Sequence, residues 1–346
     1  MIERARVLGH QPCSRRTALR MLGAWGACLG GVGASFRTVR ALAQDEPRPA
    51  DWQVTLGDPQ TFVWDMGVEV AAGAGAARGL TATFPVPIDW PEQSVEVMDE
   101  RVGDDLRLVM RDFDEQARLA TVRIPRIEPG QTRRAVVRLR VRKSWLEAPS
   151  DPSSLTLPER VPAGLRGYLQ PSPYIESDDR VIRELAEEVI DESLPAWDRV
   201  EAIYSWVREN IAYEFDERIH SCRAALAAKK GDCEELSSLF IALCRVGGIP
   251  ARAVWIPGHT YPEFLLESTQ GEMLWFPCQA AGEAHDFGRM PEWKPILQKG
   301  DRFRVPGQRE PQRYLAPTLA AQDAAAAPSL KWVLEQVLND DGSPAQ

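Results

Sequence analysis

The sequence has few metal-binding residues and no long hydrophobic run. It contains four histidines and six cysteines in 346 residues, and no two cysteines stand in a Cys-x-x-Cys pair. Structural zinc sites need clustered cysteine and histidine ligands, so we expect none here. No apolar stretch reaches the about 20 residues that a transmembrane helix needs, and no internal repeat is present. These absences argue against a zinc domain, a helical membrane protein and a repeat protein.

The N-terminal region has the pattern of an export signal. Arg15 and Arg16 are followed by a Gly- and Ala-rich, mildly apolar stretch over 21–34, and Ala-Leu-Ala at 41–43 supplies the small residues that a signal peptidase reads. This order is typical of a twin-arginine signal. We therefore expect residues 1–43 to be a signal peptide and the mature protein to be periplasmic or extracellular. The alternative is an amphipathic or disordered N-terminal arm.

The net charge argues against anionic partners. Residues 1–43 hold seven arginines and one glutamate, whereas the whole chain has a net charge of −9, so the remaining chain carries about −15. Nucleic acids and anionic membranes bind basic surfaces, so we expect neither as a partner. Solubility accounts for the acidic surface, and the sequence does not indicate an oligomeric state.

Strand-like segments dominate residues 50–148. Five segments have strand composition and are separated by turn-rich pieces: 61–70, 80–86, 106–110, 121–124 and 135–141. In the run VVRLRVR, apolar and basic residues alternate strictly, which places one face of the strand on a core and the other in water. We expect a β-sandwich-like domain without catalytic residues.

Residues 160–315 combine helices with strands. Apolar residues recur at helical spacing after a capping residue at Ser177, and again from Val200 to Ile211. Three strand-like segments follow further along the chain: 251–256, 263–267 and 273–276. Helices followed by antiparallel strands predict an α+β domain.

Two stretches read as connections. Residues 149–173 are rich in proline and serine. Residues 316–346 contain an alanine-rich link and then the run SLKWVLEQVLN. We expect this last stretch to be a flexible tail with a short helix in that run.

One cysteine stands where a helix is expected to begin. Gly231 permits a tight turn, Asp232 is a good N-cap, and an apolar face recurs after Cys233 until a glycine pair ends the helix. Unpaired N–H groups in the first helical turn favour a thiolate. Glu234 and Glu235 suit the helix dipole but oppose that effect. The helix alone does not decide between a nucleophile and a structural or disulfide-bonded cysteine.

A histidine downstream is a candidate base for this thiol. His259 lies between two expected strands in the run GHTYPEF. A cysteine nucleophile needs a group that takes its proton and returns it to the leaving amine, and imidazole has a suitable pKa. A cysteine on a helix with a histidine on a neighbouring strand is a geometry that unrelated folds have reached.

These motifs resemble the transglutaminase-like superfamily, whose core has the papain-like cysteine-protease arrangement. The runs that carry the resemblance are WVRENIAYEF, then AALAAKKGDCEELSSLFIALCRVGGIPARAV, then HTYPEF, within roughly 168–288. The resemblance implies that Cys233 is the nucleophile and His259 the base, with Tyr261 and Glu263 in the aromatic and acidic positions that usually follow the histidine. It also implies helices packed on an antiparallel sheet over 160–315.

The third position departs from the family pattern. An aspartate usually follows a tryptophan and a proline there, whereas Cys278 follows the proline in this chain. Removing the orienting acid in a related triad costs about four orders of magnitude in rate. Gln279 can orient the ring by a neutral hydrogen bond, as an asparagine does in papain-like enzymes; otherwise Asp286 reaches the ring or the site is inactive. A disulfide of Cys278 with Cys233 or Cys222 is a further alternative.

The resemblance implies acyl transfer, or amide or peptide hydrolysis, on a protein or peptide substrate. The sequence has no acidic loop of the calcium-binding type, so we expect no metal and no cofactor. The alternative is a binding or scaffolding protein that keeps the fold without catalysis, because Cys278 replaces the aspartate.

Overall fold

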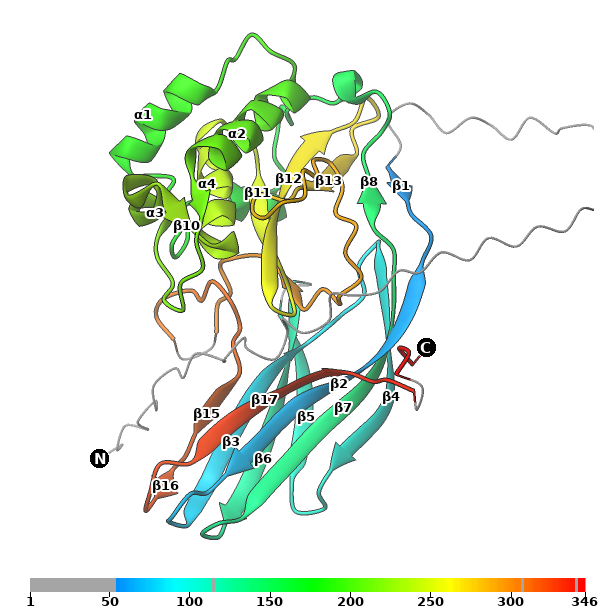
Figure 1. Ribbon diagram of the computed structural model, residues 1–346, viewed down its shortest axis with the longest axis vertical. Helices are drawn as coiled ribbons and strands as arrows, with labels where there is room; N and C mark the ends of the chain where they lie inside the picture. Colours follow the sequence, from blue (N-terminus) through cyan, green and yellow to red (C-terminus); the bar gives the residue numbers. More distant parts are fainter. Residues whose placement is uncertain (1–53, 114–115, 306–307, 340–341, 346) are drawn as a thin grey trace, which may run out of the picture.

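The computed structural model describes residues 54–345 except for 114–115, 306–307 and 340–341 (Figure 1). The expected signal peptide, residues 1–43, lies outside this part of the chain. Within the described part, none of the helices is long and apolar enough to cross a membrane.

The lower half in Figure 1 is a sandwich of two antiparallel sheets. One sheet contains, in spatial order, β17 (Ser329–Gln336), β2 (Gln60–Ala71), β7 (Thr132–Lys143) and β4 (Gln93–Val102). The facing sheet contains β5 (Arg107–Phe113), β6 (Ala117–Ile127) and β3 (Ala77–Val86), with the short β15 (Thr318–Ala320) and β16 (Asp323–Ala324) pairing with β3.

The inward side chains of these strands form one apolar core. Alternate residues of β2 and β7, such as Met66 and Val137, face alternate residues of β3 and β6, such as Phe84 and Val122, and all are buried. The five expected strands are all present and each is longer than expected. Strand β4 was not expected, because its residues are mostly exposed and carry little apolar alternation.

The C-terminal residues correct the expectation of a flexible, partly helical tail. Residues 329–336 form strand β17, which pairs with β2 from Ser329 opposite Ala71 to Gln336 opposite Trp64. Leu330 and Trp332 alternate with polar residues and pack on the sandwich core. Residues 329–336 therefore belong to the sandwich and lie next to β2.

The upper half in Figure 1 packs four helices against a sheet. The helices are α1 (Arg180–Val189), α2 (Ala196–Asn210), α3 (Cys222–Ala228) and α4 (Cys233–Val246), and the sheet strands are β11 (Ala251–Ile256), β12 (His259–Glu267) and β13 (Met273–Pro277). Helix α4 lies at the centre, since every residue from Cys233 to Arg245 is buried. Helix α1 is capped by Asp179 rather than by the expected Ser177, and α3 was not expected.

Short elements complete the fold. The two-residue strands β1 (Thr55–Leu56) and β8 (Leu146–Glu147) pair with each other, as do β9 (Ala212–Tyr213) and β10 (Lys230–Gly231). The 3-10 helices η2 (Pro152–Ser154) and η3 (Ala163–Leu169) lie in the connection between the two halves.

Strand β14 (Gln298–Lys299) joins the two halves. It pairs with β11 of the upper sheet and, at Gln298 opposite Ala117, with β6 of the sandwich. Next to this junction the buried Lys299 Nζ lies 2.5 Å from Glu92 Oε1 and 2.7 Å from Glu263 Oε1. A continuous sheet and a buried ion-pair cluster thus connect the sandwich to the layer that carries His259.

Candidate active site

A complete capping box fixes Cys233 at the first position of α4. The Asp232 carboxylate accepts a hydrogen bond from Glu234 N at 2.7 Å, and the Glu235 carboxylate accepts one from Asp232 N at 2.9 Å. These bonds satisfy donors that a helix start leaves unpaired. The prediction of a helix that begins at this cysteine is confirmed, and the Cys233 side chain is almost fully buried.

Both glutamates after the cysteine have donors that compensate their charge. Glu235 Oε1 accepts a second hydrogen bond, from His220 N at 2.8 Å. Glu234 Oε2 lies 3.1 Å from Nη2 of Arg313. Both carboxylates that follow Cys233 are therefore paired in the structure. Arg313 had no signal in the sequence, because it lies far downstream of the cysteine segment.

The packing of α4 on β12 brings His259 to the same end of the interface as Cys233. Ser237 Oγ, one helical turn after Cys233, lies 3.4 Å from Thr260 O, which follows His259. Residues i and i+4 of a helix share a face, so the turn that carries Cys233 continues toward the start of β12. A tight turn at Gly258, with φ of 73°, begins β12 at His259.

The ring of His259 is hydrogen-bonded to Gln279. Its Nε2 lies 2.9 Å from Gln279 Oε1. An amide oxygen only accepts hydrogen bonds, so Nε2 carries the proton and the basic lone pair of the neutral ring is on Nδ1. This tautomer is the one that a thiol-to-imidazole proton transfer at Nδ1 requires.

The backbone of Gln279 is held on both sides. Its N–H donates to Asp286 O at 2.7 Å, and its carbonyl accepts from Arg208 Nη1 at 2.6 Å. Arg208 Nη2 donates to Gly282 O at 2.7 Å. One guanidinium on α2 therefore binds both ends of the loop 279–282. Arg208 was not singled out in the sequence, where an arginine near the end of an amphipathic helix reads as a solvent-facing residue.

Residues 183–280 match the family model described as transglutaminase-like superfamily. This segment is similar to a transglutaminase-like core. It holds Cys233, His259 and Gln279, whereas Arg313 lies after it.

A solved structure supports a similar fold. A protein from Cytophaga hutchinsonii described as a candidate cysteine protease superposes with a TM-score of 0.55 at 16% identity, over 83% of this chain and 94% of that one. The periplasmic domain of TgpA from Pseudomonas aeruginosa bound to ethylmercury covers 62% of this chain and 88% of that one at 15% identity, but its TM-score is 0.30. The likeness to the Cytophaga hutchinsonii structure shows an α+β fold similar to transglutaminase-like cysteine protease folds.

A curated relative adds a short match. An uncharacterized protein from Haemophilus influenzae is 28% identical over 95 residues, which are 25% of this chain and 25% of that protein. The match therefore spans only about a quarter of the relative's length.

The position where transglutaminase-like cores usually have an aspartate is filled by a buried thiol. Cys278 is fully buried, and this burial raises its pKa well above its usual value. Both Cys278 and Cys222 are free thiols, so neither forms the disulfide considered above. Cys222 Sγ instead donates to Glu176 Oε2 at 3.1 Å.

Asp286 contributes to the loop through its backbone. Its carbonyl accepts the hydrogen bond from Gln279 N, while its carboxylate accepts one from Arg289 Nε at 2.8 Å. The structure thus brings Gln279, and not the Asp286 carboxylate, to His259. Among the described residues no group of three or more His, Cys, Asp and Glu side chains is arranged to hold a metal ion.

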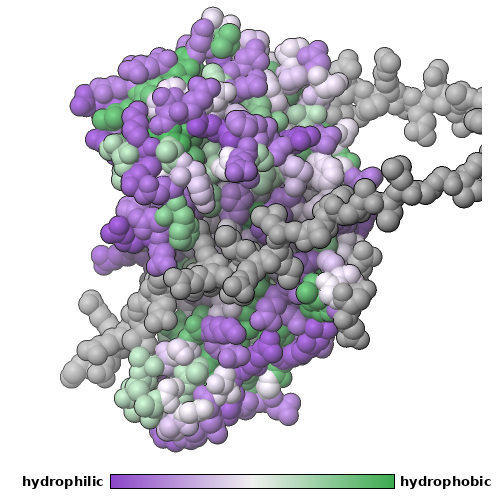
Figure 2. Space-filling view, viewed as in Figure 1, coloured by the Kyte–Doolittle hydropathy of each residue, from purple (hydrophilic) through white to green (hydrophobic). Residues whose placement is uncertain are grey.

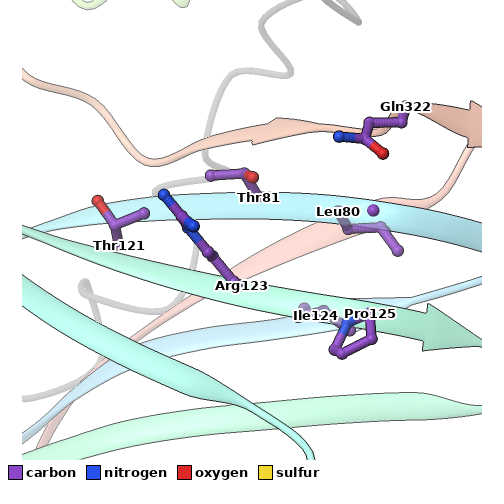
Figure 3. A pocket seen from close by; sticks show the side chains of 8 residues that line it. Leu80, Thr81, Thr121, Arg123, Ile124, Pro125 and Gln322 are labelled. Atoms are coloured by element: carbon purple, nitrogen blue, oxygen red, sulfur yellow. The ribbon is translucent and has the colours of Figure 1, made fainter.

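A shallow hollow on the sandwich is separate from these residues. It lies over β3 and β6 and is lined by residues such as Thr81, Thr121, Arg123 and Gln322 (Figure 3). Arg123 is its one charged lining residue, and no member of the transglutaminase-like core contributes to it. We assign no chemistry to this hollow.

Proposed function

We propose that the protein is an exported cysteine-dependent hydrolase of amide or peptide bonds, with Cys233 as nucleophile, His259 as base and Gln279 as the residue that orients the histidine. The observation that supports this best is the 2.9 Å contact between His259 Nε2 and Gln279 Oε1. It selects the histidine tautomer needed for proton transfer, in a core where the cysteine starts a helix.

The reaction proceeds through a thioester. His259 takes the proton of Cys233, and the sulfur adds to the substrate carbonyl carbon. The resulting imidazolium returns the proton to the leaving nitrogen as the C–N bond breaks, which releases an amine. Water, deprotonated by His259, then attacks the thioester to give a carboxylic acid and the original thiol. With an amine in place of water, the same intermediate gives a new amide.

A glutamine behind the histidine is a weaker partner than an aspartate. It fixes the ring orientation and the tautomer, but it carries no charge to stabilise the imidazolium. The half-buried Arg208 holds the carbonyl of Gln279, which keeps the neutral amide in place. We therefore expect a working site whose rate is below that of an aspartate-containing one.

Exposed aromatic side chains beside the nucleophile fit a peptide substrate. Tyr213 and Phe215 are 56% and 50% exposed. Strand β9, which contains Tyr213, pairs with β10, which leads into Asp232 and Cys233. Figure 2 shows a mostly hydrophilic surface in this view, with apolar side chains scattered among polar ones. Such aromatic groups provide apolar contact area for substrate side chains.

Site-specific alkylation tests this proposal. Cys233 in the mature protein should react with iodoacetamide faster at pH 7 than a cysteine in an unfolded peptide, and His259→Ala should remove that advantage. Peptide-amide hydrolysis should fall about 10²- to 10⁴-fold in His259→Ala and be abolished in Cys233→Ala. A fluorescent primary amine added to the assay separates hydrolysis from transamidation.

A second function has one observation in its favour, the replacement of the aspartate by Cys278. A binding or scaffolding protein with an inactive site would show ordinary Cys233 reactivity and no effect of His259→Ala. Both results together would falsify the hydrolase proposal. Cleavage of the precursor after residue 43, detected by N-terminal sequencing of the exported protein, tests the export signal separately.

A further inference from the structure

A segment that follows the transglutaminase-like core is anchored beside β11. We call residues 300–305 and 308–315 the strap. Its first residue, Gly300, donates to Ala253 O at 2.7 Å. At its other end, Leu315 N donates to Gln298 Oε1 at 2.9 Å. Both ends of the strap are thus fixed to the sheet on which α4 packs.

The strap contacts α4 at each end of the helix. Near the C-terminal end, Arg245 Nη2 lies 2.9 and 2.7 Å from the two carboxylate oxygens of Asp301, and this pair is almost completely buried. Near the N-terminal end, Arg313 Nη2 lies 3.1 Å from Glu234 Oε2. One helix is therefore held by two ion pairs to a segment outside the part of the chain that matches the family.

The guanidinium of Arg313 is confined between two aromatic rings. Its Cζ lies 5.0 Å from the centroid of Tyr174 and 5.1 Å from that of Trp255, and its side chain is only 10% exposed. Trp255 is itself fixed, because its Nε1 donates to Gly300 O at 2.8 Å. A confined, water-poor cation interacts more strongly with a neighbouring carboxylate than an exposed one.

The carboxylate that Arg313 contacts belongs to the residue next to the nucleophile. A negative charge beside a thiol disfavours its ionisation, and a cation paired to that charge cancels the effect. Arg313 thus pairs with the carboxylate of the residue that directly follows Cys233.

The other charged groups around the N-terminal end of α4 pair with groups other than Arg313. The Asp232 and Glu235 carboxylates accept backbone N–H bonds within the capping box. The neighbouring elements contribute further groups, each with a partner in the structure: His220 with Asp216, Arg223 with Asp179, His259 with Gln279, and Arg208 with two backbone carbonyls.

We propose that Arg313 is a positioning residue for the Cys233 nucleophile, which holds and neutralises the Glu234 carboxylate and so keeps the thiol ionisable at neutral pH. This inference rests on the proposed role of Cys233. Arg313 contacts Glu234, Tyr174 and Trp255, so in this proposal it acts through the Glu234 charge.

A four-protein cycle tests the proposal in the full mature chain: wild type, Arg313→Gln, Glu234→Gln and the double variant. The readout is the rate of Cys233 alkylation by iodoacetamide against pH, followed by mass spectrometry of the Cys233 peptide. Arg313→Gln should move the midpoint of this profile up by about one pH unit, which slows alkylation about tenfold below the midpoint. Glu234→Gln should move it down, and the double variant should return close to the wild type.

Two further variants separate charge from folding. Arg313→Lys keeps the cation and should keep the midpoint near the wild-type value, even if stability falls. Arg138→Gln removes an arginine that pairs with Asp65 in the sandwich at 2.7 and 2.8 Å, and it should leave the profile unchanged. If Arg313→Gln does not fold, the downward shift in Glu234→Gln and the retained midpoint in Arg313→Lys still decide.

The proposal is overturned if the double variant is as slow as Arg313→Gln, or if Glu234→Gln does not move the midpoint. These outcomes differ from a failure of the proposed function, in which wild-type Cys233 reacts no faster than a peptide thiol and His259→Ala has no effect. A reactive, His259-dependent Cys233 with no response to Arg313→Gln therefore rejects this inference alone.

Discussion

Ion pairs differ in burial between the sandwich and the upper half of the molecule, which contains α4. On the sandwich, cross-strand pairs such as Arg140 with Glu96 lie in solvent, with side chains 39% and 63% exposed. Around α4, Arg245 and Asp301 are 0% and 2% exposed, and Lys299 and Glu263 are each 3% exposed. Exposed pairs contribute little to stability, whereas a buried pair leaves an uncompensated charge when one partner is lost. Exposed pairs such as Arg140–Glu96 therefore lie on the surface of the sandwich, whereas the buried pairs around α4 fix the position of the site.

The largest expected difference between the two regions concerns stability. Asp301→Ala leaves Arg245 buried without its carboxylate partner, so the free energy of unfolding should fall by about 3–5 kcal/mol. Glu96→Ala in the sandwich should change it by about 1 kcal/mol or less. Urea denaturation of both variants measures the contrast. Equal losses in the two variants would remove the distinction between the two kinds of ion pair.

Lys143 sharpens the comparison within one strand, because β7 carries both the exposed Arg140 and a buried lysine at its end. Burial lowers the pKa of Lys143 to about 8, although its Nζ donates to Lys294 O at 2.9 Å. The unfolded chain keeps the usual pKa, so between pH 8 and 10.5 it binds more protons than the folded state. Stability should therefore rise with pH across this window, by about 3 kcal/mol.

The measurement for Lys143 is the free energy of unfolding against pH for the wild type and Lys143→Met. The methionine cannot titrate, so its curve should lack the rise. Arg140→Met serves as the matched control on the same strand and should retain it. Parallel curves for wild type and Lys143→Met would show that this lysine is hydrated in the folded protein.

Gln279 gives the next largest effect, now on the reaction. Gln279→Ala removes the acceptor of the 2.9 Å contact with His259 Nε2, so kcat for peptide-amide hydrolysis should fall about a hundredfold with KM little changed. Gln279→Glu restores an acceptor at the same reach and adds a charge that stabilises the imidazolium. It should recover activity and shift the pH profile upward, which an effect on folding alone would not do.

Local chemistry made the start of the site predictable from sequence. Asp232 and Glu235 stand within three residues of each other, so the capping box and the helix that starts at Cys233 follow from short-range rules. The bounds of β11 were predicted for the same reason, since a short apolar run between turn residues defines it. The favoured partner of His259, Gln279, also stands next to the position where the family pattern places the acid.

The features that the sequence did not predict depend on contacts between residues far apart in the chain. Leu330, Val333, Leu334 and Val337 fit a helical spacing, while Leu330, Trp332 and Leu334 also alternate as in a strand, and only pairing with β2 selects the strand. Arg313 and Arg208 read as ordinary surface arginines until the fold places them against Glu234 and Gln279. No local pattern in the sequence predicts these contacts.

Arg208 should show the smallest of these effects, and it tests whether a half-buried arginine on α2 can serve the reaction rather than stability alone. Arg208→Met keeps much of the side-chain volume but removes the donors to Gln279 O and Gly282 O. The amide should then hold His259 less firmly, and kcat should fall about tenfold. Arg180→Met, on the exposed face of α1 where Arg180 pairs with Glu184, is the control.

In the Gln279→Ala background, Arg208→Met should lower kcat almost no further, because Arg208 acts on the histidine through Gln279. Independent, multiplying losses would instead assign Arg208 to the stability of the loop.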